Sequence, residues 1–101
     1  MSAPVAITLL TQSSCGLCEH AKEVLGRLGA EFAVSVTEID LRTDEGRHLA
    51  EGAGVLFAPG VLIEGHPFSY GRLPERKLRK LLQYLAAQQR ANGDDTVTTT
   101  S

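Results

Sequence analysis

Two cysteines, Cys15 and Cys18, stand where a strand-like segment gives way to a helical pattern. Residues 5–11 are short, apolar and partly β-branched, which favours a strand. From Cys15 onward the period changes, and apolar residues recur at i, i+3, i+7 and i+10: Cys18, Ala21, Leu25 and Leu28. This period predicts an amphipathic helix ending near Gly29. Cys15 therefore lies at the helix N-terminus, and Cys18 lies on the face that packs against the core.

The rest of the chain alternates between strand and helix patterns. A strand is expected from Phe32 towards Leu41, with a bulge or an emergence from the core near Thr37 and Glu38. Thr43 caps a short helix with a thin apolar face, and residues 60–63 form a further strand. Residues 64–67 are turn residues, and residues 68–71 return as the second strand of a hairpin.

The last predicted element is a helix opened by Pro74 and Glu75. Its apolar face consists of leucines at i, i+3, i+4 and i+7: Leu78, Leu81, Leu82 and Leu85. The order βαβαββα predicts an α/β fold with a four-stranded mixed sheet and helices on both faces. We expect residues 1–90 to form one domain and residues 91–101 a disordered polar tail.

Composition narrows the function classes. The chain has 101 residues, a formal net charge of −2 and no long run of either sign, so nothing indicates a nucleic-acid or membrane surface. The apolar runs are too short to span a bilayer, and the N-terminus lacks the pattern of a signal peptide. We expect a cytoplasmic monomer in a reducing compartment.

The cysteine spacing favours chemistry over structural cross-linking, because closing a four-residue loop restricts the unfolded chain very little. At a helix N-terminus, unpaired N–H groups and the helix dipole favour the thiolate, so the pKa of Cys15 is expected below its free value of roughly 8.5. Cys15 is the predicted nucleophile. Cys18 is the predicted resolving thiol, which attacks the mixed disulfide and releases the reduced substrate.

Neighbouring polar residues suggest other roles, but weakly. Glu19 opposes thiolate formation and Lys22 offsets it in part, although a solvated helix face explains both residues better. A zinc site needs about four ligands, and the three histidines show no regular ligand spacing with the cysteines: His20, His48 and His66. No metal ligand is predicted, although His20 is close enough to influence the dithiol.

The segment Cys15-Gly16-Leu17-Cys18 between a strand and a helix, followed by Ala58-Pro59 before a strand, resembles the thioredoxin superfamily over roughly residues 4–88. Within it the chain is most similar to the short glutaredoxin-like proteins. The resemblance implies the thioredoxin fold and a cis Pro59 that packs against the dithiol. It also implies that the backbone of Ala58 pairs with substrate, and that Gly16 and Leu17 belong to the substrate-binding surface.

The resemblance implies a thiol–disulfide oxidoreductase that reduces protein or glutathione mixed disulfides in cell redox homeostasis and electron transport. No bound cofactor is expected, and either glutathione or a thioredoxin reductase would be the electron donor. Residues 68–75 are loosely similar to redoxins that take electrons from thioredoxin reductase. Two alternatives stay open: a metal-binding module, with zinc or an iron–sulfur cluster shared through Cys15, and an interaction domain with little turnover.

Overall fold

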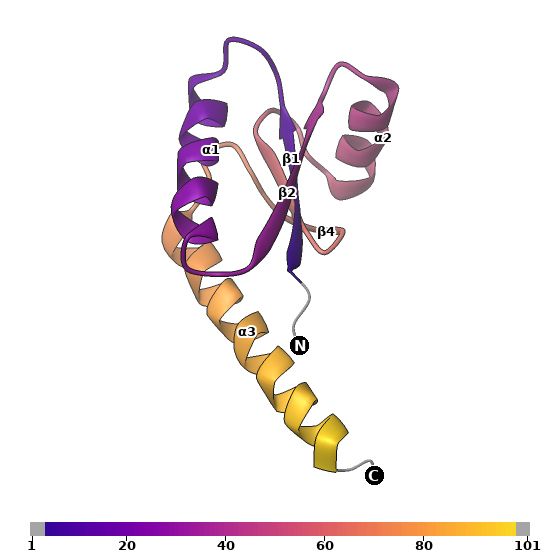
Figure 1. Cartoon of the computed structure of the whole chain (residues 1–101). Helices are drawn as coiled ribbons and strands as arrows, with labels where there is room; N and C mark the ends of the chain where they lie inside the picture. The colour runs from indigo at the N-terminus through magenta and orange to yellow at the C-terminus, as the bar shows by residue number, and fades with distance from the viewer. Residues whose placement is uncertain (1–3, 99–101) are drawn as a thin grey trace.

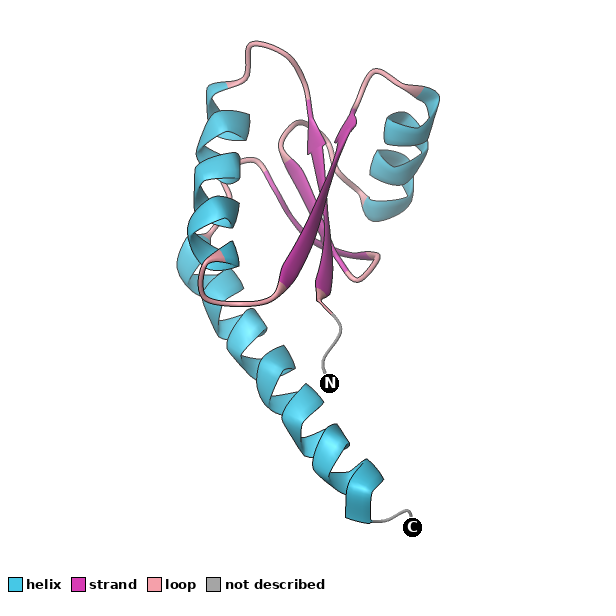
Figure 2. Cartoon of the chain, in the orientation of Figure 1, coloured by secondary structure: helices cyan, strands magenta, loops and turns pink. Residues whose placement is uncertain are grey.

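The computed structural model describes residues 4–98, with side chains up to residue 88. The element order is the predicted βαβαββα (Figures 1 and 2). In chain order the elements are β1 (Val5–Thr11), α1 (Gly16–Gly29), β2 (Val34–Asp40), α2 (Asp44–Ala53), β3 (Gly60–Ile63), β4 (His66–Tyr70) and α3 (Glu75–Thr98). Among the described residues, no helix is both long and apolar enough to cross a membrane.

The four strands form one mixed sheet in the order β2-β1-β3-β4. β1 pairs in parallel with β2 and antiparallel with β3, and β3 and β4 form the predicted hairpin. In the register of β1 and β3, Leu10 lies opposite Gly60. The C-terminal end of β1 and the N-terminal end of β3 therefore lie side by side at the same end of the sheet.

The sheet carries helices on both faces, as predicted (Figure 1). One face packs against α1 and α3 around a large core that includes Leu9, Leu28 and Leu78, each fully buried. The other face packs against α2 around a small core of Leu10, Ala50 and Leu62. Because α1 lies against the larger core, the helix that begins beside Cys15 has the more extensive support.

The predicted bulge in β2 is wrong, whereas the predicted emergence from the core is confirmed. β1 and β2 keep an unbroken register from Val5↔Val34 to Thr11↔Asp40. β2 is an edge strand whose residues 35–38 are all exposed, so the alternation lapses there because neither face is buried. The register shift lies instead between Val61 and Leu62, opposite β4.

The hairpin turn is shorter than predicted, since β4 already begins at His66. Glu64 and Gly65 both adopt left-handed backbone conformations, with φ of 53° and 82°. Two successive residues with positive φ reverse the chain in a tight hairpin and leave Pro67 inside the returning strand. Pro67 is tolerated because β4 is an edge strand.

α3 continues to Thr98, which differs from the disordered tail predicted for residues 91–101. The first half of the helix is fixed by packing of Leu78 and Leu82 against the core. Once a helix is formed, each further residue adds one hydrogen bond, so it extends through residues of low helix propensity. Residues 99–101 lie outside the described residues.

Candidate redox site at the start of α1

Cys15 is the N-cap residue of α1. Its backbone is extended, with φ −117° and ψ 107°, and its Sγ accepts the backbone N–H of Cys18 at 3.1 Å. Ser and Asp side chains commonly cap helices in this way, so here a sulfur occupies the position of a capping oxygen. The cysteine that the sequence places at the helix N-terminus therefore directly contacts one of its unpaired N–H groups.

The two cysteines differ in exposure and are joined by a disulfide. Their Cα atoms are 5.2 Å apart. Cys15 is partly exposed beside the β1–α1 loop, whereas Cys18 is 1% exposed and packs on the core side of α1. The structure thus places the predicted nucleophile at the surface and the predicted resolving thiol behind it.

The acidic residue in the first turn of α1 is Glu19, which follows Gly16 and Leu17. Gly16 is exposed, and Leu17 is 37% exposed. Glu19 pairs with Lys22 at 3.4 Å, and Lys22 also lies 3.6 Å from Glu38 on β2. The hydrogen bond that Lys22 donates to Glu19, together with the negative charges of Glu19 and Glu38, raises the pKa of Lys22. Part of the negative charge of Glu19 is therefore balanced by Lys22 rather than acting on Cys15.

Ala58 and Pro59 lie at the edge of the sheet from which the chain runs to Cys15. The Ala58–Pro59 peptide bond is cis, as the resemblance implied. Pro59 is fully buried, and Ala58 is 7% exposed. Since Leu10 pairs with Gly60, Pro59 continues β3 opposite Thr11, the last residue of β1. The sheet therefore brings the cis-proline segment to the loop that carries the dithiol.

An exposed apolar surface precedes Ala58, and the sequence analysis did not single it out. Leu56 is 75% exposed and Phe57 is 55% exposed. The Phe57 ring lies edge-to-face with Tyr70 of β4, with ring centroids 5.1 Å apart. A Cβ on Gly71, whose φ is 80°, would lie 3.1 Å from the Phe57 ring. The sequence feature that could have indicated this surface is the apolar run of residues 55–58 before Pro59. Leu56 and Phe57 in this run are exposed instead of forming a strand of the core.

Salt bridges hold the helix that carries the dithiol against α3. Arg27 of α1 pairs with Glu75 at 2.7 Å, and Arg79 of α3 pairs with Glu31 and, at 3.5 Å, with Glu75. These groups are partly exposed, so each pair contributes modestly to stability. Together they link the last turn of α1 and the residues after it to the start of α3.

The three histidines do not converge on the cysteines. His48 and His66 are exposed, and His20 is half-buried with an Nδ1 atom that has no hydrogen-bond partner among the described residues. Among the side chains that the structure describes, those of residues 4–88, no group of three or more His, Cys, Asp or Glu is arranged to hold a metal ion.

Comparison with known proteins identifies the family. A sequence model of the glutaredoxin-like domain (DUF836) matches residues 6–83, which is most of the chain. The chain belongs to this family. Over 81 residues this glutaredoxin-like protein is 28% identical to a probable thioredoxin from Archaeoglobus fulgidus, covering 80% of this chain and 89% of the relative.

Further relatives and solved structures agree on the superfamily. Glutaredoxin-C1 of Arabidopsis thaliana is 33% identical over 63 residues, covering 59% of this chain and 49% of that protein. A mutant thioredoxin from Halobacterium salinarum NRC-1 superimposes with a TM-score of 0.61 and 25% identity, covering 79% of this chain and 73% of that one. The thioredoxin-like protein BC3987 gives a TM-score of 0.60 with 28% identity, covering 75% and 99%. The glutaredoxin-like protein therefore has the thioredoxin fold.

Proposed function

We propose that this glutaredoxin-like protein is a dithiol oxidoreductase that reduces disulfides of other proteins, with Cys15 as nucleophile and Cys18 as resolving thiol. One observation carries the proposal: Cys15 caps α1, accepts an N–H from the helix and is partly exposed, whereas its disulfide partner Cys18 is buried. A thiolate at Cys15 would keep this hydrogen bond and gain from the helix dipole.

The reaction balances as two thiol–disulfide exchanges. The Cys15 thiolate attacks one sulfur of the substrate disulfide, forms a mixed disulfide and expels the other substrate sulfur as a thiolate that takes up a proton. Cys18 then loses its proton to solvent and attacks the Sγ of Cys15. This second exchange forms the Cys15–Cys18 disulfide and releases the second substrate thiol, so two electrons have passed to the substrate.

A protein substrate is favoured by the surface around the dithiol. Leu17, Leu56 and Phe57 expose apolar side chains, which is a property of protein-binding surfaces. Leu17 lies between the two cysteines, and Phe57 lies two residues before Pro59. We infer that this surface contacts the polypeptide around the substrate disulfide, with the Gly16, Leu17, Ala58 and Pro59 backbone nearest to the sulfurs.

The electron donor belongs to the same proposal. Two glutathione molecules could reduce the Cys15–Cys18 disulfide and leave as glutathione disulfide, or a thioredoxin reductase could deliver two electrons from NADPH. Offering each donor separately to the oxidised protein, and measuring NADPH consumption with glutathione reductase or thioredoxin reductase, distinguishes the two. If neither glutathione nor thioredoxin reductase reduces the Cys15–Cys18 disulfide, both proposed electron donors are wrong.

The function is tested by two cysteine variants in an insulin-disulfide reduction assay. Cys15→Ser is expected to abolish activity, because no nucleophile remains at the surface. Cys18→Ser is expected to accumulate a mixed disulfide between Cys15 and insulin, detectable by mass spectrometry of alkylated protein. If both variants reduce insulin as well as the unaltered protein does, the proposed function is wrong.

A further inference from the structure

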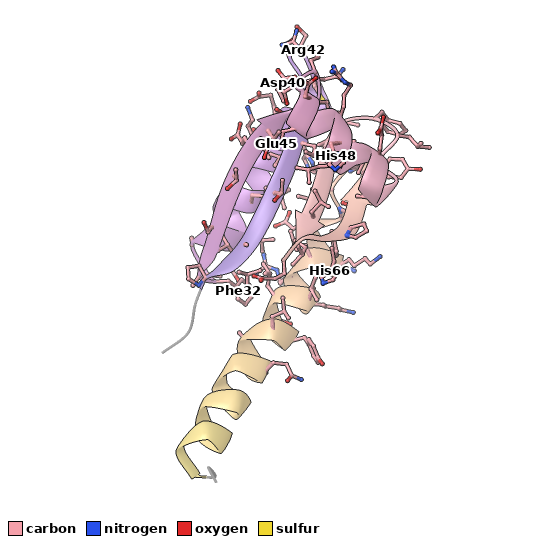
Figure 3. All side chains as sticks on the ribbon, turned by 90° about the vertical axis from the view of Figure 1, so that its right-hand side faces the viewer. Phe32, Asp40, Arg42, Glu45, His48 and His66 are labelled. Carbon is pink, nitrogen blue, oxygen red and sulfur yellow. A yellow bond between two sulfur atoms is a disulfide. The ribbon has the colours of Figure 1, made fainter. Side chains whose placement is uncertain are left out.

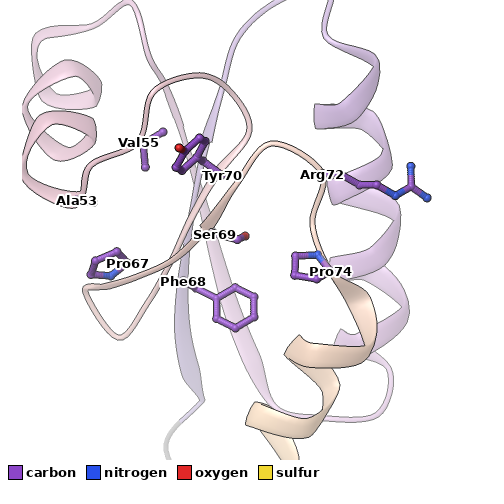
Figure 4. A pocket seen from close by; sticks show the side chains of 8 residues that line it. All are labelled: Ala53, Val55, Pro67, Phe68, Ser69, Tyr70, Arg72 and Pro74. Carbon is purple, nitrogen blue, oxygen red and sulfur yellow. The ribbon is translucent and has the colours of Figure 1, made fainter.

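A groove runs along the outer edge of β4, the last strand of the sheet. Its volume is about 400 Å³. Ala53 and Val55 line it from the end of α2, and Arg72 and Pro74 line it from the segment before α3, with residues 67–70 of β4 between them (Figure 4). We call this feature the β4-edge groove.

The backbone of Tyr70 faces this groove. Gly71 donates its N–H to the carbonyl of Pro59 at 2.8 Å, towards β3. Hydrogen bonding alternates along an antiparallel strand, so the N–H and C=O of Tyr70, which lies opposite Gly60, point away from β3. Tyr70 therefore offers one donor and one acceptor to an incoming strand.

The edge is poorly protected at this end. Natural edge strands are commonly guarded by proline, bulges or charged side chains. In β4 the proline is Pro67, and the register shift falls at Phe68 in the middle of the strand, so both devices lie before Ser69. Ser69 and Tyr70 carry neither device, and the Ser69 Oγ is buried without a hydrogen-bond partner among the described residues.

The charge of the groove is one-sided. Arg72 is the charged residue among those that line the groove, and it forms no ion pair with any described residue. Next to the groove, the Lys77 ammonium lies 5.5 Å from the centre of the Phe68 ring. An occupant with carboxylate side chains would complement both cations.

We propose that the β4-edge groove binds an extended, acidic segment of the substrate protein, which pairs with the backbone of Tyr70 and places a carboxylate at Arg72. The inference rests on the proposed function, because it specifies the substrate of the same dithiol. The Tyr70 ring contacts Phe57, two residues before Pro59, so the groove is continuous with the surface beside the dithiol. Strand addition supplies backbone hydrogen bonds, and Arg72 supplies selectivity.

Two synthetic peptides test the selectivity. Both carry one cysteine linked as a disulfide to 5-thio-2-nitrobenzoate and flanked by Val and Thr, with Glu at two positions in one peptide and Lys in the other. The unaltered protein is expected to reduce the Glu peptide with a kcat/KM about fivefold higher, since an exposed ion pair contributes up to about 1 kcal/mol. Arg72→Glu is expected to remove or reverse this preference.

Lys80→Glu is the matched control. It makes the same change of charge on α3 at an exposed residue that does not line the groove, and it is expected to keep the preference for the Glu peptide. Both variants are expected to reduce bis(2-hydroxyethyl) disulfide at the unaltered rate, because this small substrate does not reach the groove.

Strand addition is tested by hydrogen exchange. With the Glu peptide held as a mixed disulfide on Cys15 of the Cys18→Ser protein, exchange of the Tyr70 amide is expected to slow at least about tenfold relative to the free protein. Equal rates for the two peptides, or unchanged exchange at Tyr70, would overturn the proposal. Failure of the unaltered protein to reduce any disulfide would instead contradict the proposed function.

Discussion

The starts of α1 and α2 share one capping geometry but differ in chemistry. In α1 the Sγ of Cys15 accepts the N–H of Cys18 at 3.1 Å, and in α2 the Oγ1 of Thr43 accepts the N–H of Gly46 at 2.9 Å. Both caps have extended backbones and follow a strand of the same parallel pair. The third residue of each helix is a second cysteine in α1 and a glycine in α2.

Charge separates the two helix starts further. α2 has Asp44 and Glu45 in its first turn, which compensate the positive end of its dipole, whereas the acidic residue in the first turn of α1 is Glu19, which follows Gly16 and Leu17 and pairs with Lys22. At α1 the negative charge favoured by the helix can come from the Cys15 thiolate itself. The start of α1 thus combines an ionisable cap with a buried second cysteine, whereas the start of α2 combines a polar cap with two acidic residues.

The largest effect is expected at Gly46, because its position excludes any side chain. A Cβ there would lie 2.1 Å from the carbonyl oxygen of Asp40. Gly46→Ala is expected to lower the free energy of unfolding by about 2 kcal/mol or more, the range of overpacking. Gly52→Ala is the control: it lies in the same helix with open space around it, and is expected to stabilise by about 0.5–1 kcal/mol. Urea unfolding measures both, and equal effects would contradict the steric argument.

The next effect concerns the positive end of the α1 dipole beside Cys15. Gly16 has open space around it, so Gly16→Asp fits and places a carboxylate beside Cys15. In the reduced protein this is expected to raise the pKa of Cys15 and slow its alkylation by iodoacetamide about fivefold at pH values below that pKa. Gly16→Asn has nearly the same shape without the charge and is expected to leave the rate unchanged. Slowing by both variants would point to a steric cause.

Cap deletion compares the two helices directly. Cys15→Ala, measured against Cys15→Ser so that both variants lack the disulfide, is expected to cost about 1 kcal/mol of unfolding free energy. Thr43→Ala against Thr43→Ser is expected to cost a similar amount, since each serine keeps an acceptor for its helix. Chemical denaturation of the four variants checks this. A cost at Thr43 alone would show that the Cys15 cap matters only for reactivity.

The smallest effect is a pH dependence at the approach to α2, where Asp40, the last residue of β2, lies close to Arg42 (Figure 3). The side-chain hydrogen bond from Arg42, joined by its backbone N–H, lowers the pKa of Asp40 from its ordinary 3.8. The resulting stabilisation is present above the unfolded pKa and lost as pH falls through the folded one. In Asp40→Asn the melting temperature is expected to fall less steeply as the pH drops below about 4 than it does in the unaltered protein. An identical acid profile would assign the loss to other carboxylates.

Much of the fold follows from local pattern. The period of three to four residues after Cys15 fixed the buried face of α1, and the leucines from Leu78 to Leu85 fixed that of α3, because amphipathic helices must bury their apolar stripe. Of the two explanations for the lapse near Thr37 and Glu38, the emergence from the core is confirmed and the bulge is not, because alternation weakens on an exposed edge strand and the sequence does not show which strand lies at an edge.

The sequence alone is enough to predict Cys15 at a helix start, the burial of Cys18 and the βαβαββα order, since each depends on residues close together in the chain. Strand pairing and packing place Pro59 beside the loop after β1, bring Phe57 against Tyr70 and leave β4 with an open edge. The first of these depends on pairing between segments some 50 residues apart, and the second joins residues 13 positions apart in the chain. Local periodicity carries no information about which strands pair, because the pairing is chosen by the packing of the whole sheet.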